Sequence, residues 1–428
     1  MEEILKQKEK AILVAVQLPR SRRWEVENSL DELERLVITA GAEATKRVIQ
    51  DRDAPHRRTF IGPGKSREIE AFSRSIGADL VAFNHELSPS QQRNLEEVIS
   101  SKILDRTALI LDIFAQRAHS SEGKLQVELA QYVYRLSRLR GRGIELSRLG
   151  GGIGTRGPGE TKLEVDLRRI RARIRHLTKE LSKLRQRRTL QRKKRKKSAV
   201  FSVSLVGYTN AGKSTLLNAL TDAKVFVEDK LFATLDSTVR RLDFPSSDGL
   251  PQKKHAVVLS DTVGFIKDLP HELIAAFRST LDEVREAQLL LHVVDAAHPQ
   301  MEEQIKAVEK VLAEIGADNL PKIMVFNKID KIPKNEAAGL KGRLPEAVFI
   351  SALNKEGLPD LLAAIEKKII PKLVQVRLKI PFDKGKVLER IYQGGRVLSS
   401  EHTPEGTLIV AELPAEDISR IKKLIKED

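Results

Sequence analysis

Polar stretches that each follow an apolar run carry the residues of this chain that could do chemistry. In chain order they are residues 207–214, 261–264, 327–330 and 351–353. The first stretch, GYTNAGKS, has the form G-x-x-x-x-G-K-[ST] and lies between the apolar run 201–206 and a helical pattern that begins at Thr215. A strand, a glycine-rich loop and a helix form the context in which this motif binds phosphate. The sequence therefore predicts a site for a nucleoside triphosphate.

The first two stretches supply groups for phosphates and a metal ion. Lys213 would reach the β- and γ-phosphates, and the Ser214 hydroxyl would bind Mg²⁺. Asp261 ends the apolar strand 256–260, where its carboxylate can hold Mg²⁺ through water. The backbone N–H of Gly264 is placed to contact the γ-phosphate. We therefore predict Mg²⁺-dependent hydrolysis of the triphosphate.

The last two stretches choose the base. Asp330, in the sequence NKID, can accept both donors on the ring edge of guanine, a pair that adenine lacks. The Lys328 stem can lie over the base, and the Ala352 N–H can meet the guanine O6. The predicted nucleotide contacts are Gly207, Tyr208, Thr209, Asn210, Ala211, Gly212, Lys213, Ser214, Thr215, Phe232, Ala233, Thr234, Asp261, Thr262, Val263, Gly264, Asn327, Lys328, Asp330, Ser351, Ala352 and Leu353. The site is thus expected to take GTP and GDP.

Residues 231–238 should form the segment that closes over Mg²⁺ and the γ-phosphate when GTP is bound. Thr234 and Thr238 both qualify as its metal ligand, and Thr234 is preferred. The predicted metal ligands are then Ser214, Thr234 and Asp261, and the predicted catalytic groups are Lys213, Thr234 and Gly264. Phe265 stands where Ras-type GTPases carry a water-orienting glutamine, so hydrolysis without a partner should be slow.

Asn210 in the phosphate loop leaves two interpretations open. In some GTPases an asparagine at this place holds K⁺ between the α- and γ-phosphates, and K⁺ would then be a second cation here. Alternatively, Asn210 only caps the backbone of the loop.

Composition indicates an intracellular protein with a polyanionic partner. The formal net charge is +16, which favours nucleic acid or another anionic surface. Aromatic residues make up only 4%, which argues against base-stacking platforms. Cysteine is absent, which excludes disulfides and thiolate metal sites. Because no apolar run approaches the ~18 residues of a membrane helix, we expect a cytoplasmic protein, with peripheral association with a membrane left open. We also expect a monomer.

The pattern of elements predicts an α/β protein in four parts. Residues 1–112 should form a small α/β domain, with strands near 11–18 and 79–83 and helices at 29–40 and after Ser88. Residues 113–198 should form an antiparallel helical hairpin. Residues 199–371 should form a P-loop GTPase domain, with strands at 202–206, 256–260, 289–294, 323–326 and 348–350. Residues 372–428 should form a small α+β domain, with strands at 374–380 and 406–413 and a helix at 383–394.

The predicted hairpin carries the signs of an RNA-contacting element. Heptad-spaced leucines and isoleucines run along both helices, the second of which should cover about 161–197. Between the helices lies a glycine- and arginine-rich tip, and residues 185–197 contain no acidic side chain. Glycine allows close backbone approach, and arginine offers a planar donor fork to phosphates. The alternative is that the charge run is only a solvated linker.

Several stretches together resemble the signature of HflX-type GTPases. They are GGGIGTRGPGETKLEVD at 150–166, FIGPGK at 60–65, FNHEL at 83–87, FATLD at 232–236 and DTVGF at 261–265. The resemblance covers about 10–371 and the tail more loosely. One departure is Ser237, where the family usually has proline.

The resemblance implies a ribosome-associated GTPase that binds the large subunit and its rRNA, with the hairpin reaching toward the peptidyl-transferase region. Some such proteins split stalled ribosomes. ATP binding by the N-terminal domain is also suggested for the family, although residues 1–112 contain no recognisable second nucleotide motif. The alternatives are an RNA-remodelling NTPase or a ribosome-assembly GTPase.

Overall fold

The computed structural model describes most of the chain. The described residues are 8–140, 162–197, 201–221, 231–232, 234–235, 238–243, 256–267, 278–369, 373–394, 396–404, 406–414, 418, 421–422 and 424–425. They divide into two compact units, Met1–Glu356 and Gly357–Asp428, which are considered separately below.

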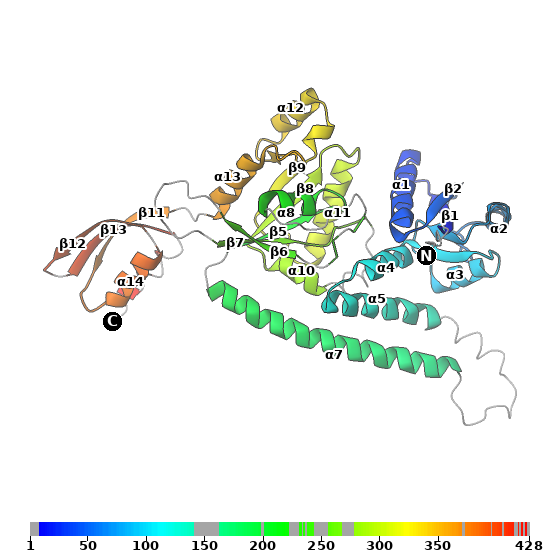
Figure 1. The fold of residues 1–428 in the computed structure, drawn as a ribbon, viewed down its shortest axis with the longest axis horizontal. Helices are drawn as coiled ribbons and strands as arrows, with labels where there is room; N and C mark the ends of the chain where they lie inside the picture. Colours follow the sequence, from blue (N-terminus) through cyan, green and yellow to red (C-terminus); the bar gives the residue numbers. More distant parts are fainter. Residues whose placement is uncertain are drawn as a thin grey trace, which may run out of the picture. The chain divides into compact units, whose positions relative to one another are not determined.

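The first unit begins with a parallel four-stranded sheet (Figure 1). Its strand order is β2-β1-β3-β4, with β1 (Lys10–Gln17), β2 (Glu43–Asp51), β3 (Leu80–Phe83) and β4 (Lys102–Asp105). Its helices are α1 (Arg23–Ala40), α2 (Pro63–Ile76) and α3 (Pro89–Glu96). The predicted strands at 11–18 and 79–83 and the helix after Ser88 are confirmed within one residue. The helix predicted at 29–40 is confirmed but begins earlier, at Arg23. The strands β2 and β4 were not predicted.

Alternation along β1 explains how this sheet is covered on both faces. Successive side chains of a strand point to opposite faces. Leu13 therefore joins the core beneath α1, with Leu33 and Leu36, whereas Ile12 and Val14 join the core on the other face. All five side chains are fully buried. This two-sided burial is why β1 reads as a continuous apolar run rather than an alternating one.

Two short helices and one long helix follow β4. They are α4 (Arg106–Arg117), α5 (Ser121–Arg140) and α7 (Lys162–Lys197). Helices α5 and α7 run side by side in opposite directions, as predicted (Figure 1), and Arg173 of α7 binds Glu128 of α5 through Nε and Nη2 at 2.8 and 2.9 Å. The seam residues Leu177 and Leu181 are buried. The predicted glycine- and arginine-rich tip lies outside the described residues.

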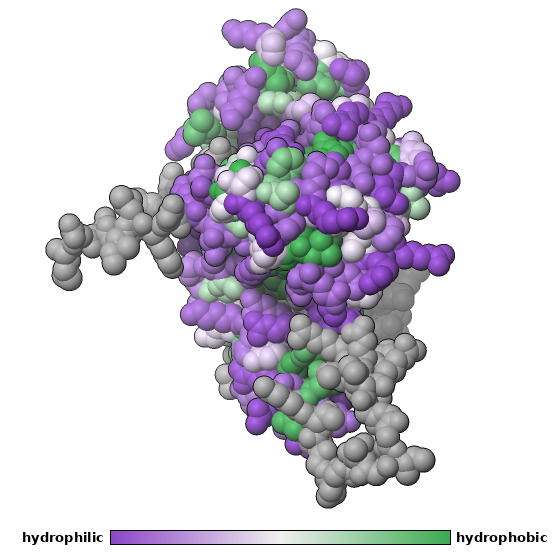
Figure 2. Space-filling view, turned by 90° about the vertical axis from the view of Figure 1, so that its right-hand side faces the viewer, coloured by the Kyte–Doolittle hydropathy of each residue, from purple (hydrophilic) through white to green (hydrophobic). Residues whose placement is uncertain are grey.

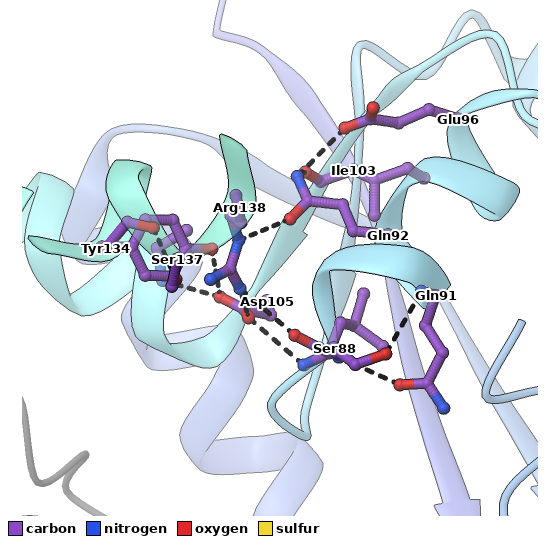
Figure 3. Close-up of polar contacts among 11 residues, drawn as sticks. Ser88, Gln91, Gln92, Glu96, Ile103, Asp105, Tyr134, Ser137 and Arg138 are labelled. Carbon is purple, nitrogen blue, oxygen red and sulfur yellow. Dashed lines mark hydrogen bonds and ion pairs between the residues drawn. The ribbon is translucent and has the colours of Figure 1, made fainter. Parts of the chain in front are cut away.

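Asp105, the last residue of β4, attaches α5 to the N-terminal domain. Figure 3 shows its carboxylate beside Tyr134 and Arg138 of α5. Asp105 Oδ1 accepts from Tyr134 Oη at 2.9 Å, and Oδ2 accepts from Arg138 Nη2 at 2.5 Å and from the Leu87 N–H at 3.2 Å. The same carboxylate caps α4 by accepting from the Ala108 N–H at 2.8 Å. Because this carboxylate is fully buried, these hydrogen bonds take the place of those that water would make.

The first unit ends in a six-stranded sheet of order β10-β9-β8-β5-β7-β6. The strands are β5 (Phe201–Gly207), β6 (Thr238–Asp243), β7 (Ala256–Asp261), β8 (Leu289–Asp295), β9 (Lys322–Asn327) and β10 (Val348–Phe349). The described helices are α8 (Lys213–Thr221), α10 (Arg278–Arg285), α11 (Met301–Glu314) and α12 (Lys334–Arg343). All five predicted strands are confirmed. The unpredicted β6 is antiparallel to β7.

The second unit contains α13 (Leu358–Ile369) and a three-stranded antiparallel sheet of order β11-β13-β12. Its other elements are β11 (Leu373–Ile380), α14 (Gly385–Gly394), β12 (Arg396–Thr403) and β13 (Gly406–Pro414). Ile380, Ile391 and Ile409 are central to its core. The predicted strands 374–380 and 406–413 and helix 383–394 are confirmed, whereas β12 was missed.

One face of the molecule is predominantly polar (Figure 2). Figure 2 shows a largely hydrophilic face on which hydrophobic residues form small separate groups. Within the part of the chain that the structure describes, no helix has the length and apolar character needed to cross a membrane.

Candidate functional site

The loop between β5 and α8 has the backbone conformation that a phosphate loop requires. Gly207 has a φ of +153° and Gly212 a φ of +94°. A Cβ on Gly207 would lie 2.2 Å from the Val293 carbonyl oxygen, and one on Gly212 would lie 2.2 Å from Asn327 Nδ2. Asn210 also adopts a left-handed conformation, with φ +63°. Glycine at 207 and 212 is therefore required both by conformation and by close neighbours on β8 and β9.

Lys213 opens α8 and turns back over the loop. Its Nζ donates to the carbonyl oxygens of Gly207 and Tyr208 at 3.0 and 2.8 Å. The side chain is buried, and this burial lowers the pKa of Lys213 to about 8, although the nearby Asp261 carboxylate opposes the shift. A buried ammonium at this point, in the first turn of a helix, is suited to bind phosphate oxygens.

The lowered pKa predicts a pH dependence of nucleotide affinity. With a pKa of about 8, the lysine of the free protein should lose its proton progressively as the pH rises through this value, and phosphate binding would have to restore it. We expect affinity for GTP and GDP to fall with rising pH above this point, by up to about tenfold per pH unit. An unperturbed lysine would give no fall before its ordinary pKa of 10.5.

Titration calorimetry in buffers of different ionisation enthalpy should detect proton uptake on binding at about pH 8.5 and little at about pH 7. Constant affinity from about pH 7.5 to 9.5 would contradict this role for Lys213.

Oxygen atoms from the first turn of α8, the end of β7 and segment 231–238 converge beside Lys213. Ser214 Oγ donates to Asp261 Oδ2 at 2.6 Å and lies 2.7 Å from Thr234 Oγ1. Asp261 is fully buried, which raises its pKa, and its Oδ1 has no hydrogen-bond partner. A cation would satisfy that oxygen and remove the cost of burying the carboxylate. Carboxylate and hydroxyl oxygens are the ligands of a hard divalent ion, so this set fits one.

The structure distinguishes the two threonines of segment 231–238. Thr234 lies beside Ser214, whereas Thr238 is the first residue of β6 and pairs with Asp261 in the sheet. Thr234 is thus the better candidate for a metal ligand. Phe232 has a φ of +55° and its ring packs edge-on against Phe114 of α4, with centroids 4.7 Å apart. The predicted contact Ala233 lies outside the described residues.

Residues 262–265, which follow β7, are hydrogen-bonded to the phosphate loop through Phe265. The Thr209 N–H donates to the Phe265 carbonyl at 2.7 Å, and the Phe265 N–H donates to the Gly207 carbonyl at 3.1 Å. A Cβ on Gly264 would lie 2.9 Å from Thr209 Cα and 3.2 Å from Lys213 Nζ. The backbone of Gly264 therefore lies against Thr209 of the phosphate loop and close to the Lys213 ammonium. The Phe265 ring is buried in the core, so it offers no hydrogen bond to a water molecule.

The neighbouring residues of this stretch are held by the sheet. Thr262 is fully buried and donates from Oγ1 to the Leu205 carbonyl at 2.7 Å, and Val263 is also buried. In the phosphate loop, Ala211 is buried, and Thr215 is half-buried in the first turn of α8.

The predicted base-binding stretches meet the phosphate loop at the carboxyl ends of β9 and β10. Asn327 Nδ2 donates to the Ala211 carbonyl and Asn327 Oδ1 accepts from the Ala352 N–H, both at 2.9 Å. Asn327, at the end of β9, therefore joins the phosphate loop to the loop that follows β10. Asp330 is exposed in a short 3₁₀ helix, η1 (Ile329–Lys331), where its carboxylate is available to a base. Ser351 is buried and Leu353 is 74% exposed.

Lys328 binds Asp295, a residue that the sequence motifs did not indicate. Its Nζ donates to the Asn210 carbonyl at 2.8 Å and to Asp295 Oδ2 at 2.7 Å. Asp295 is the last residue of β8. An acidic residue at the end of a predicted strand, like Asp261 at the end of β7, is the one sequence signal that could have identified it. By pairing with the ammonium, Asp295 leaves the aliphatic stem of Lys328 free to cover a base.

The comparisons with known proteins cover nearly all of the chain. Three family models match in order: a GTP-binding GTPase N-terminal domain at 27–115, a GTP-binding GTPase middle region at 117–195, and a 50S ribosome-binding GTPase domain at 202–328. A GTPase HflX of Caldanaerobacter subterraneus is 48% identical over 99% of this chain and 96% of its own. This chain belongs to the HflX family of GTPases.

Other HflX proteins agree. The GTPase HflX of Escherichia coli is 45% identical over 90% of this chain and 88% of its own, and that of Alkalihalophilus pseudofirmus is 44% identical over 98% and 96%. As an HflX-family member the chain binds and hydrolyses GTP, and the family in general implies a divalent cation requirement. The resemblance to HflX-type GTPases that the sequence motifs indicated is thus confirmed.

Proposed function

We propose that this GTPase is a switch that binds the large ribosomal subunit when GTP is bound and that its helical hairpin contacts rRNA. The observation that carries the proposal is the match of residues 202–328 to a family described as 50S ribosome-binding GTPases, in a chain of formal net charge +16. Splitting of stalled ribosomes is the consequence we propose for this binding.

The hairpin offers the surface for such a contact. Along α7, Arg168, Arg169, Arg171 and Arg175 are exposed. Arginines that neutralise backbone phosphates bind RNA with a strong dependence on salt. Hydrogen bonds from Tyr134 and Arg138 to the buried Asp105 carboxylate hold the hairpin to the N-terminal domain, so its basic surface is presented on a fixed support.

Sedimentation with separated ribosomal subunits tests the proposal. The full chain should sediment with the large subunit in the presence of a non-hydrolysable GTP analogue, and much less with GDP. Binding to any RNA irrespective of nucleotide would instead favour an RNA-remodelling NTPase. Preference for incomplete subunit precursors would favour a role in ribosome assembly.

Deletion of residues 150–159 is expected to separate nucleotide chemistry from ribosome action. These residues are remote in sequence from the GTP site, so GTP affinity should stay within about twofold of the parent. Dissociation of ribosomes into subunits, followed by light scattering, should be lost because the tip would act as a wedge on rRNA. Splitting by the deleted protein at the parental rate would refute the wedge.

The cation that completes the site is proposed to be Mg²⁺, held by Ser214, Thr234 and Asp261. It would neutralise charge between the β- and γ-phosphates. In the same reaction Lys213 and the Gly264 N–H would contact the γ-phosphate, and Asn327 would keep the base loops aligned with the phosphate loop.

Potassium is proposed as a second cation because Asn210 holds a left-handed backbone beside the phosphate site and Phe265 supplies no polar group. Hydrolysis should then be faster in K⁺ than in Na⁺ at matched ionic strength, by roughly tenfold. Equal rates in the two salts would leave Asn210 with only a capping role.

A further inference from the structure

The third residue of the phosphate loop, Thr209, carries a buried hydroxyl group that has no partner among the described residues. Thr209 is 6% exposed, and its Oγ1 makes no hydrogen bond within the part of the chain that the structure describes. By contrast, the Ser214 hydroxyl of the same motif donates to Asp261 Oδ2 at 2.6 Å. Burial of a hydroxyl without a partner costs folding free energy, so such a group in a native protein calls for an explanation beyond packing.

The side chain of Thr209 packs against Gly264. A Cβ atom built on Gly264 would lie 2.8 Å from Thr209 Cγ2 and 3.2 Å from Lys213 Nζ. The hydroxyl and the methyl group of threonine branch from one carbon, and a side chain of this kind has few χ1 rotamers. The hydroxyl is therefore confined to the part of the loop where Gly264 and the Lys213 ammonium come close together.

Backbone hydrogen bonds anchor the phosphate loop at Thr209. Its N–H donates to the Phe265 carbonyl at 2.7 Å, and the Phe265 N–H donates to the Gly207 carbonyl at 3.1 Å. Lys213 Nζ donates to the carbonyl of the preceding residue, Tyr208, at 2.8 Å. A polar group on an anchored backbone needs little rearrangement at the moment of reaction, which is the condition for electrostatic catalysis.

Hydrolysis of GTP makes use of hydrogen-bond donors in this region. In phosphoryl transfer the protein contributes mainly by positioning and by stabilising the charge on the transferred group. The residue after Gly264 is Phe265, whose ring is buried in the core and offers no hydrogen bond. The Thr209 hydroxyl is a polar group beside Gly264 that no other described residue engages, so it is available for this task.

We propose that Thr209 is a catalytic residue for GTP hydrolysis, whose hydroxyl donates a hydrogen bond to an oxygen of the γ-phosphate as that group is transferred. It joins Lys213 and the Gly264 N–H, the two contacts of the γ-phosphate that are proposed above. The role of Thr209 rests on that proposed phosphate site and is independent of ribosome binding.

The hydroxyl acts on the charge of the transferred group. In hydrolysis the water oxygen forms a bond to the γ-phosphorus, and the bond from this phosphorus to the bridging oxygen breaks. The bridging oxygen keeps the electron pair and leaves as part of GDP. One hydrogen of the water stays on the new phosphate, and the other is released to solvent as a proton. Thr209 keeps its own proton and stabilises the transition state by its hydrogen bond.

The variants Thr209→Val and Thr209→Ser separate the hydroxyl from the shape of the side chain. Valine keeps the shape and removes the hydroxyl, whereas serine keeps the hydroxyl and removes the methyl group. In single-turnover reactions of the full chain, Thr209→Val should hydrolyse GTP roughly ten- to a hundredfold more slowly, as expected for loss of one preorganised donor. Thr209→Ser should stay within about threefold of the parental rate, because it retains that donor.

Nucleotide affinity and thermal unfolding distinguish catalysis from a structural role. GDP affinity of Thr209→Val should stay within about twofold of the parent, and affinity for a non-hydrolysable GTP analogue within about threefold, because the contact strengthens in the transition state. The nucleotide-free valine variant should melt at or above the parental temperature, since it no longer buries a hydroxyl without a partner.

Thr221→Val is the matched control. Thr221 ends α8, the helix that follows the phosphate loop, and its Oγ1 donates to the Leu217 carbonyl at 2.7 Å. This hydroxyl already has a partner within its own helix. The control variant should hydrolyse GTP at the parental rate.

Three results would overturn the role of Thr209. One is a parental rate of hydrolysis in Thr209→Val. Another is a lower melting temperature of this variant together with an equal loss of GTP and GDP affinity, which would show that the hydroxyl only stabilises the loop. The third is a loss of rate in K⁺ but not in Na⁺, which would make the hydroxyl a ligand of that cation.

Lys213→Met shows whether the phosphate site itself has been placed correctly. If this variant lost nucleotide affinity while Thr209→Val kept the parental rate, the phosphate site would stand and only the role of Thr209 would be rejected. If Lys213→Met kept parental affinity, the phosphate site would be wrong, and the role of Thr209 would be rejected with it.

Discussion

Asparagine in place of Asp330 should change the base preference of this GTPase from guanine to xanthine nucleotides. The carboxylate can accept from both the N1–H and the N2–H₂ group of guanine, whereas an amide presents a donor of its own to one of them. We expect GTP affinity to fall roughly a hundredfold or more and XTP affinity to rise, because a mismatched polar pair leaves a desolvated group unsatisfied. Competition between GTP and XTP for a fluorescent nucleotide measures the reversal.

The position of Asp330 allows a clean control. Its side chain is exposed in η1, so the substitution should leave the melting temperature of the nucleotide-free protein nearly unchanged. Asp318→Asn, at another exposed position in the same unit, should leave base preference as it is. If the Asp330 variant kept full selectivity for GTP, recognition of the base would have to lie elsewhere.

Methionine in place of Lys213 should remove most nucleotide affinity without harming the fold. The ammonium would contact the β- and γ-phosphates in a buried site, where charge-assisted hydrogen bonds are strong. We expect GTP and GDP affinity to fall by roughly a hundred- to a thousandfold, which corresponds to about 3–4 kcal/mol. The loss should be visible by calorimetry or by displacement of a fluorescent nucleotide.

Thermal unfolding separates this effect from misfolding. Burial lowers the pKa of Lys213, so the folded protein pays for its charge near neutral pH, and an uncharged side chain of similar length removes that cost. The nucleotide-free variant should therefore melt at or above the parental temperature, while added GTP no longer raises its melting point. If the nucleotide-free variant melted below the parental temperature, Lys213 would have a structural role. If the variant kept the parental affinity for GTP and GDP, Lys213 would not be part of the phosphate site.

Burial on both faces and a helix cap are two of the signals by which elements were predicted from sequence. Strand β1 is an unbroken apolar run, and α3 begins with Ser88, whose Oγ accepts from the Gln91 N–H as the cap pattern requires. Two of the strands that were missed, β2 and β6, are less apolar. Strand β2 has one buried residue, Val48, and β6 carries Arg240 and Arg241 in its centre. Edge strands of this kind gain their order from pairing with a neighbour, which periodicity does not reveal.

The residues of the candidate site also divide into those that the sequence predicted and those that only the structure showed. The residue types of the four motifs, and their places at strand ends, were readable because phosphate, metal and base each require particular chemical groups at short spacing. Asp295 and the bracing role of Asn327 were not readable, since both depend on which strand ends lie next to each other in the sheet.

By itself the sequence determined the reaction and the family: a GTP site from four local motifs, and an HflX-type arrangement from the glycine-rich stretch before it. Only the tertiary structure decided which of two threonines approaches Ser214, that the Phe265 ring enters the core, and that the Thr209 side chain packs against Gly264. The physical reason is distance along the chain. Motifs act through neighbours in sequence, whereas Thr209 and Gly264 belong to different motifs and meet only because β5 and β7 are neighbours in the sheet.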